Sequence, residues 1–319
     1  MTLEQLGQLS NYCVAASTGI LALAFVAYVA QWGFARNVPV ERELVAAGES
    51  GPPADRPTTG TDSTDLPDRS DVAGNIGFSL TALATVVLGV GVVTRGLAAE
   101  RVPWGNMYEF GCVAIFVALL AYVVLERVWS IDWVGPLVAG FATVVLGSTM
   151  LFVYVPPGPL VPALDSYWLV IHVIGAIVAG AAFLVGAAAS VLYLVKARAE
   201  RLTPVEERTG FLWRIPSAGV IDQVAYRVHA FAFPIWTFAA LIAGPIWAQA
   251  AWGRYWGWDA KEVWAFITWV FYAAYLHARA TAGWRGKAAA ILALAAFATF
   301  LFNYIGVNLF VGGLHSYAK

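Results

Sequence analysis

The feature that most constrains this chain is a series of apolar segments long enough to cross a lipid bilayer. Crossing takes about 20 apolar residues in a helix, and 60% of the 319 residues are hydrophobic while 12% are charged. All such segments are expected to be helical, because an open strand edge would leave backbone groups unpaired in hydrocarbon. The sequence therefore predicts an all-α, polytopic integral membrane bundle of about eight transmembrane helices. They are expected at 12–34, 74–95, 106–127, 134–155, 167–195, 228–250, 262–280 and 288–311.

Residues 36–72 interrupt this pattern, because they are rich in Pro, Gly, Asp, Ser and Thr and have no apolar period. Such composition is typical of a disordered segment. We therefore expect an N-terminal transmembrane helix over 1–35, a cytoplasmic linker over 36–72 and a second transmembrane domain over 73–319. Between Thr203 and Arg227, apolar residues alternate with charges too often for a membrane span, so we expect an interfacial helix on the cytoplasmic face there.

Lys and Arg residues predict the orientation of the chain in the membrane. Placing the linker, the turn near Arg127, the segment 196–227 and the turn 279–287 on one side collects 14 of the 19 basic residues there. The positive-inside rule makes that side the cytoplasm. Both termini and the loop at 251–264 are then expected outside.

Charge and cysteine usage exclude two classes of function. The net charge of -1 leaves no basic stripe to neutralise phosphates, so a nucleic-acid partner is not expected. Cys13 and Cys112 both lie in apolar runs without C-x-x-C spacing, which argues against thiol–disulfide chemistry in this chain.

The stretch 252–264, here called the Trp-rich loop, concentrates more aromatic side chains around few charges than any other. An interfacial belt explains scattered tryptophans, and we assign six to that role: Trp32, Trp104, Trp129, Trp133, Trp236 and Trp284. The loop itself is denser than a belt requires, with Trp252, Trp256, Trp258 and Trp264. Indoles can stack on a porphyrin face, so we interpret the loop as a platform for a flat ligand such as haem.

Charged residues of the loop have two interpretations. Arg254 and Lys261 suit the propionates of a haem. Asp259 with Glu262 three residues later also fits a capping box at the start of the next helix, which is a structural role.

The four histidines are expected near the two membrane surfaces. A helical rise of about 1.5 Å per residue places His172 and His315 at the level of the Trp-rich loop, and His229 and His277 at the inner level. A single imidazole at a helix end is often only a hydrogen-bonded polar group, and for His229 we favour that interpretation. Four together favour ligation, because ionisable groups in membrane spans are usually functional and neutral imidazole ligates haem iron.

These residues resemble a known family. The loop, from Trp252-Gly253 through Trp256-Gly257-Trp258-Asp259 to Trp264, is similar to the tryptophan-rich WWD signature of haem-handling proteins. Over residues 74–319 the chain resembles the CcsA/ResC branch of the system II cytochrome c biogenesis machinery. The matching strings are Asn106-Met107-Tyr108-Glu109, His172, Tyr275-Leu276-His277-Ala278-Arg279, Phe302-Asn303-Tyr304, Gly306-Val307-Asn308 and Gly313-Leu314-His315-Ser316-Tyr317. Ala260 departs from the family, which usually has Pro at that position.

The resemblance implies a path for haem b as a substrate in transit. Haem would enter from the cytoplasm at His277, together with a histidine of a CcsB/ResB-type partner subunit. It would then move outward to His172 and His315 as axial iron ligands. Thiols of a C-x-x-C-H motif in apocytochrome c, kept reduced by thiol reductant proteins, would add to the haem vinyl groups there.

The resemblance further implies a multi-pass protein in the lipid of the bacterial cytoplasmic (inner) membrane, with the Trp-rich loop on the external face. Cytochrome c synthase (haem lyase-type) activity would require the partner subunit, and no catalytic residue is assigned. The expected haem-binding residues are His172, His277, His315, Trp252, Gly253, Arg254, Trp256, Trp258, Asp259, Lys261 and Trp264. Further possible contacts are Asn106, Tyr108, Glu109, Asn308 and His229. His229 matches no family ligand, and we hypothesise that it supplies the second inner ligand.

Two other functions remain open from the residues alone. Paired histidines at two depths also suit a dihaem, cytochrome b-like membrane protein that transfers electrons. A solute transporter is the second alternative, but it should show internal repeats and helices broken at mid-membrane, and the sequence indicates neither.

Overall fold

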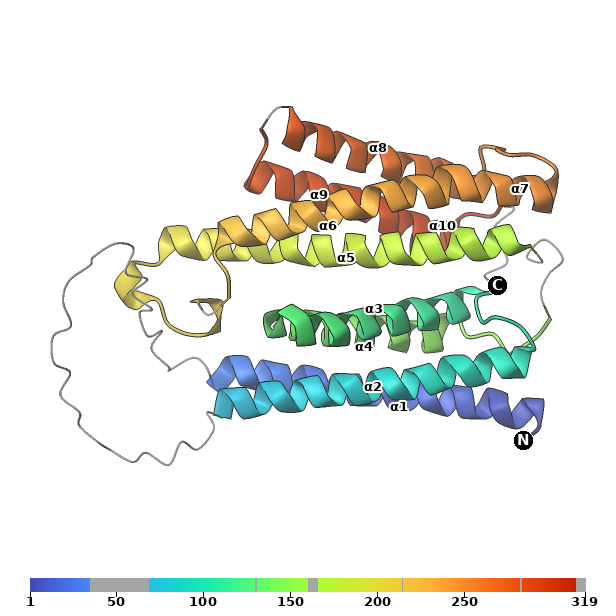
Figure 1. Ribbon diagram of the computed structural model, residues 1–319, viewed down its shortest axis with the longest axis horizontal. Helices are drawn as coiled ribbons and strands as arrows, with labels where there is room; N and C mark the ends of the chain where they lie inside the picture. The colour runs from blue at the N-terminus through green and yellow to red at the C-terminus, as the bar shows by residue number, and fades with distance from the viewer. Residues whose placement is uncertain (35–68, 130, 160–165, 214, 282, 314–319) are drawn as a thin grey trace.

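The computed structural model describes residues 1–34, 69–129, 131–159, 166–213, 215–281 and 283–313. Within these residues every regular element is helical, and the helices run along one common axis (Figure 1). They are α1 (Leu3–Phe34), α2 (Arg69–Ala99), α3 (Met107–Trp129), α4 (Gly135–Phe152), α5 (Tyr167–Leu202), α6 (Ala218–Phe238), α7 (Gly244–Trp252), α8 (Ala260–Ala280), α9 (Lys287–Leu301) and α10 (Val307–Phe310). The all-α prediction is confirmed.

Two of the expected spans contain a π-helical turn. The turn η6 (Ala239–Ala243) joins α6 to α7, and η7 (Phe302–Gly306) joins α9 to α10. Counting each joined pair as one, the described residues form eight long helical segments, of which seven are long and apolar enough to cross a membrane. The exception is α8, which carries Lys261, Glu262 and Arg279 near its ends. Large apolar side chains are exposed on the outside of the bundle, for example Leu23 and Val26 on α1, as expected for a multi-pass membrane protein in contact with lipid.

Two expected boundaries are wrong. Helix α2 begins at Arg69, so residues 69–72 of the predicted linker are helical, and the linker residues 36–68 lie outside the described residues. Among the described residues of 203–227, the predicted interfacial helix is not present as a separate element. Its second half is the start of α6, and the first half contains only the short 3-10 turns η4 (Val205–Glu207) and η5 (Phe211–Trp213).

Hydropathy misses the start of α6 because it counts Asp222 as an unpaired charge, whereas Asp222 is paired in the folded chain. Ile221 and Ala225 are buried one turn apart and form an apolar stripe that faces the bundle. Asp222, on the same turn, makes an ion pair of 2.8 Å with Arg279 of α8. Because the paired charge no longer opposes burial, the helix starts about ten residues earlier than hydropathy indicates.

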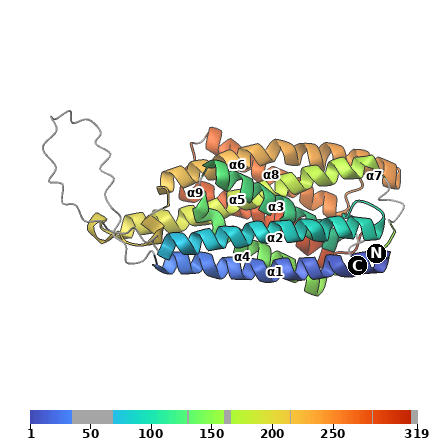
Figure 2. The same ribbon diagram turned by 60° about the horizontal axis from the view of Figure 1, so that its bottom comes forward.

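The bundle has two halves, α1–α4 and α5–α10 (Figures 1 and 2). In the first half, small residues allow α1 and α2 to approach closely. Ser10 and Ser17 of α1 donate hydrogen bonds of 2.7 and 2.8 Å to the carbonyls of Gly91 and Ala84 on α2. Hydroxyl-to-backbone bonds of this kind are a common means of association between membrane helices.

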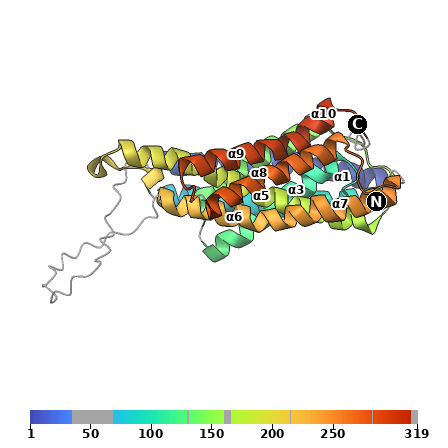
Figure 3. The ribbon, with the colours of Figure 1, turned by 90° about the horizontal axis from the view of Figure 1, so that it is seen from above.

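The two halves meet through two apolar clusters at opposite ends. At one end, Leu169 and Val173 of α5 pack with Phe110 and Val113 of α3 and with Trp247 of α7. At the other end, the cluster includes Ile215, Ile221, Trp133, Phe211 and Leu212. The first end also carries α7, α10 and the N-terminus (Figure 3), and it is called the loop end below. The position of the N-terminus agrees with the predicted topology, but the side of the membrane stays a prediction.

The packing of α5 against α6 provides a test of the fold. A Cβ atom added at Gly186 of α5 would lie 2.5 Å from Cε1 of the buried His229, so Gly186→Ala should lower the free energy of unfolding by about 1–3 kcal/mol. The matched control is Gly219→Ala on α6, where no atom lies within 4 Å. It should leave stability unchanged or raise it by up to about 1 kcal/mol. Equilibrium unfolding in detergent micelles measures both, and equal stabilities for the two variants would contradict this packing.

Candidate functional site

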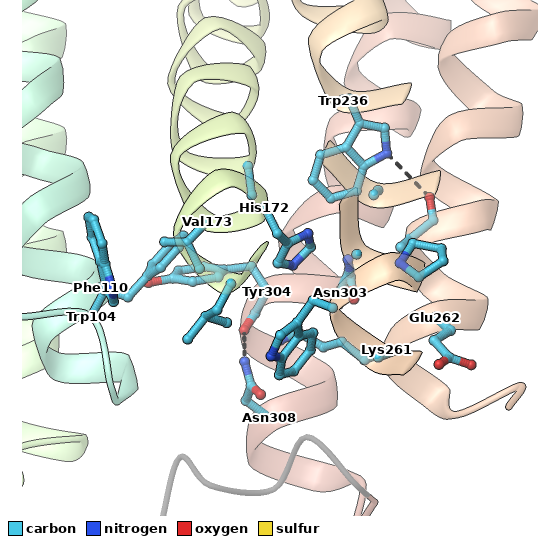
Figure 4. A pocket seen from close by; sticks show the side chains of 18 of the residues that line it. Trp104, Phe110, His172, Val173, Trp236, Lys261, Glu262, Asn303, Tyr304 and Asn308 are labelled. Atoms are coloured by element: carbon cyan, nitrogen blue, oxygen red, sulfur yellow. Dashed lines mark hydrogen bonds between the residues drawn. The ribbon is translucent and has the colours of Figure 1, made fainter. Parts of the chain in front are cut away.

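A pocket of about 1190 Å³, counting its open mouth, lies at the loop end between the two halves. Its walls come from the start of α3, from α5, from both π-turn segments and from the Trp-rich loop with the start of α8 (Figure 4). Aromatic side chains dominate its lining: Trp104, Phe110, Trp236, Trp247, Tyr255, Trp256, Phe300 and Tyr304.

His172 is held in this pocket by a hydrogen bond to the backbone. Its Nδ1 lies 2.8 Å from the carbonyl oxygen of Ala239 in η6. A carbonyl only accepts, so Nδ1 carries the proton and the lone pair of the neutral ring is on Nε2. The ring plane of Trp247 lies within 10° of the imidazole plane, with ring centroids 5.9 Å apart. The ring is therefore fixed in the tautomer that can ligate iron through Nε2.

Both π turns of the described residues line this pocket. Helix α7 follows η6 directly, and its second residue, Pro245, has no N–H to donate. Such turns occur frequently at functional sites because they redirect backbone and side-chain groups. Both spans continue through their π turns as single helical segments, Ala218–Trp252 and Lys287–Phe310, so the turns widen these helices without breaking them.

The Trp-rich loop is held in shape by its own polar groups. Helix α7 ends where Gly253 takes a left-handed conformation with φ of 74°, which glycine adopts without strain. The predicted capping box of Asp259 and Glu262 is confirmed at the start of α8. The Glu262 carboxylate also accepts a hydrogen bond of 2.8 Å from the backbone N–H of Gly257. The carboxylate therefore ties the middle of the loop to the first turn of the next helix.

Only some of the loop residues that were expected to bind haem line the pocket. Trp256 and Lys261 line the pocket. Trp252 packs edge-on against Trp247, with ring centroids 4.8 Å apart, and Trp264 packs on Phe302 at 4.2 Å. Three further residues of the expected set are not among the lining residues: Gly253, Arg254 and Asp259. Trp258 is not among them either and is 70% exposed. Haem contacts of the residues outside the lining stay predictions.

The motif at the start of α3 is divided in the same way. Asn106 lines the pocket, as does Asn308 of α10. Tyr108 points instead into the core of the first half, where it is 1% exposed. Glu109 is fully buried and forms ion pairs of 2.9 Å with Arg95 and 2.7 Å with Arg101.

The Glu109 carboxylate shapes the pocket wall without lining it. Besides the two arginines, it accepts a hydrogen bond of 2.8 Å from the backbone N–H of Gly105, a lining residue. Asn106 in turn accepts a bond of 2.9 Å from the backbone N–H of Glu109. These contacts fix the turn between α2 and α3, which carries Trp104 and Asn106 into the pocket.

The two inner histidines do not meet. His229 is the twelfth residue of α6 rather than its first, and it is fully buried among Phe183, Tyr272 and Tyr275. His277 is exposed on α8. Tyr275 and His277 are two residues apart, so they leave the helix on nearly opposite faces. The hypothesis that His229 shares an inner iron with His277 is therefore wrong for this arrangement.

His315 lies outside the described residues, so its ligation stays a prediction. The last described residue, Gly313, lies beside the Trp-rich loop. A Cβ atom added there would be 2.7 Å from Oδ1 of Asp259. The chain therefore contacts the Trp-rich loop at Gly313, two residues before His315.

Sequence reasoning missed three contributors to the pocket. Trp104 and Trp236 were assigned to interfacial belts but line the pocket, and Trp247 was not singled out. Trp236 also donates a hydrogen bond of 3.3 Å to the carbonyl of Ala265 on α8. Trp236 lies near the middle of the span Ala218–Trp252, whereas belt tryptophans lie near helix ends. The prediction missed this because it began the span at residue 228.

The donor set suits a flat metal complex better than a bare ion. Among the described residues no group of three His, Cys, Asp or Glu side chains could hold a metal ion. A porphyrin supplies its own four equatorial nitrogens, so one imidazole from each side suffices. His172 with an aromatic lining fits such a ligand.

The buried ion pairs of Glu109 give a second testable prediction. Glu109→Gln keeps the shape but leaves Arg95 and Arg101 without their carboxylate, which should lower the free energy of unfolding by about 3–5 kcal/mol. Glu4→Gln is the matched control, because Glu4 is exposed at the start of α1, and it should change stability by less than about 0.5 kcal/mol. Chemical unfolding in detergent measures both, and a Glu109→Gln protein as stable as the control would refute the assigned network.

Comparison with known proteins identifies the family. Residues 104–315 match the family model described as cytochrome C assembly protein. The chain is 36% identical over 263 residues to the cytochrome c biogenesis protein CcsA of Synechococcus sp. (strain CC9902), covering 75% of this chain and 85% of the relative. It is 33% identical over 257 residues to the CcsA of Guillardia theta, covering 76% and 85% of the two chains.

A solved structure shares the fold. The cytochrome c heme lyase CcmF superposes with a TM-score of 0.61 at 16% identity, covering 96% of this chain and 47% of that chain. This chain thus corresponds to about half the length of that protein. With a family match that spans the pocket and with relatives above 30% identity over most of their length, this chain belongs to the cytochrome c assembly protein family, and its relatives there are CcsA proteins.

Proposed function

We propose that this chain holds haem b as a substrate in transit and presents it to apocytochrome c for covalent attachment, as a subunit of a system II cytochrome c synthase. The main support for the proposal is the imidazole of His172, which is held by its hydrogen bond to the Ala239 carbonyl in the aromatic pocket below the Trp-rich loop. The names of the relatives, cytochrome c biogenesis protein and cytochrome c heme lyase, agree with it.

In this proposal His172 and His315 ligate the iron from opposite faces. Trp256 and Trp247 supply aromatic surface around the ring, and Trp252 and Trp264 keep the loop in place through their own packing. Each cysteine S–H of the apocytochrome adds across one vinyl C=C bond. Sulfur bonds to the carbon next to the ring and hydrogen to the terminal carbon, so the addition needs no oxidant. The protein's task is to hold the vinyl groups where the thiols can reach them.

The exposed position of His277 supports a partner subunit of the CcsB/ResB type. His277 ends a stripe of exposed residues on α8 that includes Phe266 and Val270, with Ala274 between them and His277. A helix of another subunit packed on this stripe would bring its own histidine to the other side of an iron at His277. In this proposal the Trp-rich loop faces the exterior of a bacterial cytoplasmic membrane, the synthase is active only with the partner, and thiol reductant proteins keep the apocytochrome cysteines reduced.

The arrangement of the histidines disfavours the dihaem electron-transfer alternative. Such a protein needs two complete histidine pairs within its own bundle, whereas His229 is enclosed by aromatic rings and His277 faces outward. The two π turns do not support the solute-transporter alternative, because both spans stay continuous and both turns line the aromatic pocket, where Ala239 of η6 holds His172.

Haem content of the purified protein tests the proposal. The full chain, purified with and without the presumed partner from haem-replete cells, should carry haem b in a pyridine-haemochrome assay. His172→Ala and His315→Ala should each lower haem occupancy at the loop end by about tenfold or more, and added imidazole should restore it. His277→Ala should change haem only in the preparation that contains the partner.

The matched control is His229→Phe, which removes an imidazole that lies away from the pocket and leaves an aromatic ring in its place. It should keep the loop-end haem spectrum. A colourless wild-type complex, or normal maturation of c-type cytochromes in cells that lack both His172 and His315, would sink the proposal.

A further inference from the structure

One corner of the pocket has two charged side chains, Lys261 and Glu262, and the Glu262 carboxylate already accepts hydrogen bonds from the backbone N–H groups of Gly257 and Asp259. Lys261, the second residue of α8, lines the pocket. Among the described residues its ammonium makes neither a hydrogen bond nor a salt bridge, and Asp259 is the acidic group that acts on it through space. An ammonium in an aromatic pocket is costly unless an anion accompanies it. The corner is therefore suited to an anion that arrives with the ligand.

Asn303 provides the second, independent observation. It sits in the π turn η7, lines the same pocket and is only 5% exposed. Its Oδ1 is buried without a hydrogen-bond partner in the described structure. Buried amide oxygens are normally paired, so this Oδ1 needs a hydrogen-bond donor, such as a water molecule brought in with the ligand, whereas the N–H groups of the same amide can donate to a carboxylate.

Figure 4 shows how these groups divide the pocket. Lys261 and Asn303 lie on the α8 and α9–α10 side of His172, and Trp104 and Phe110 lie on the α3 side. Tyr304 continues the apolar side, with its ring 5.1 Å from that of Phe110. The charged lining residues thus lie on the α8 side, and the α3 side is aromatic apart from the polar side chain of Asn106.

Haem b has the same division. Its two propionate carboxylates leave one edge of the porphyrin, and its two apolar vinyl groups lie away from that edge. Resting on the proposed function, we infer that Lys261 and Asn303 bind the propionates and thereby orient the porphyrin, with its vinyl groups directed at the Trp104 and Phe110 end. The thiols of the apocytochrome then approach from the turn between α2 and α3, which Glu109 and Arg101 hold in place.

Arg254, the other basic residue of the loop, occupies a different position from Lys261. Arg254 is exposed and does not line the pocket. Its guanidinium instead lies against Gly257, where a Cβ atom would be 2.5 Å from its carbons and nitrogens. Lys261 and Asn303 therefore act as specificity-determining residues for the orientation of the substrate.

Binding of two porphyrins to the full-length chain in detergent provides the first test. Haem b should bind at least about tenfold more tightly than its propionate dimethyl ester, which has no charge to pair with Lys261. Lys261→Met and Asn303→Leu should each remove most of that difference, while the Soret band keeps the position set by histidine ligation. Lys261→Arg should retain the preference. Lys287→Met, which removes an exposed lysine at the start of α9, should behave like the wild type.

A cysteine placed in the pocket tests the orientation directly. In Phe110→Cys the new thiol lies at the apolar end, so it should add to a vinyl group and leave haem attached to the polypeptide on a denaturing gel. Ala265→Cys places a thiol in the lining on the α8 side and should remain unlabelled. The wild-type chain, which has Cys13 and Cys112, reports the background.

The outcomes distinguish this inference from the proposed function. Haem that binds normally, with equal affinity for the dimethyl ester and no effect of Lys261→Met, overturns the inference and leaves the proposed function standing. Labelling of Ala265→Cys instead of Phe110→Cys also overturns it, because the porphyrin then sits the other way round. A wild-type chain that binds neither porphyrin refutes both.

Discussion

The hydrogen bond between His172 and the Ala239 carbonyl is the interaction on which the site depends. In a regular membrane helix, backbone carbonyls are directed along the helix and are occupied within it. At η6 the helix widens, and the Ala239 oxygen accepts both the Gly244 N–H and the imidazole of a neighbouring helix. One bond therefore fixes the rotamer of the histidine, its tautomer and the position of α5 relative to the α6–α7 segment.

The pocket exists because the two halves of the bundle join at their ends. At the loop end an apolar cluster that includes Trp247 holds α3 against α5, and at the opposite end Trp133, which precedes α4, packs with residues of α5 and α6 and with Phe211. At the loop end the buried Arg95–Glu109–Arg101 network sets the α2–α3 turn. A buried ion pair contributes little net stability, but it permits few alternative arrangements. Its effect here is to place Trp104 and Asn106 opposite α8 at a fixed separation.

Apolar length and the spacing of motifs predicted the fold class, the eight long helices and the loop that forms one wall of the pocket. The start of α6 was missed because hydropathy counts Asp222 as a charge, whereas the folded chain pairs it with Arg279. The depth of His229 followed from that error, since a helix that begins at Ala218 carries it into the core. The roles of Trp104, Trp236 and Asn303 depend on which side of a helix faces the pocket. In a membrane helix that is apolar on all sides, no periodicity marks that side.

In the Trp-rich loop, some residues of the motif stabilise the loop itself and others line the pocket. A loop at the surface of a bundle must keep its shape before it can present a side chain, and two of its four tryptophans serve that need. Trp252 and Trp264 anchor its two ends against Trp247 and Phe302, and the Glu262 carboxylate holds its centre. With the ends and centre fixed, Trp256, which also packs edge-on against Trp258, and Lys261 reach the ligand space. A substitution at an anchoring tryptophan and one at a lining residue should therefore impair ligand binding for different physical reasons.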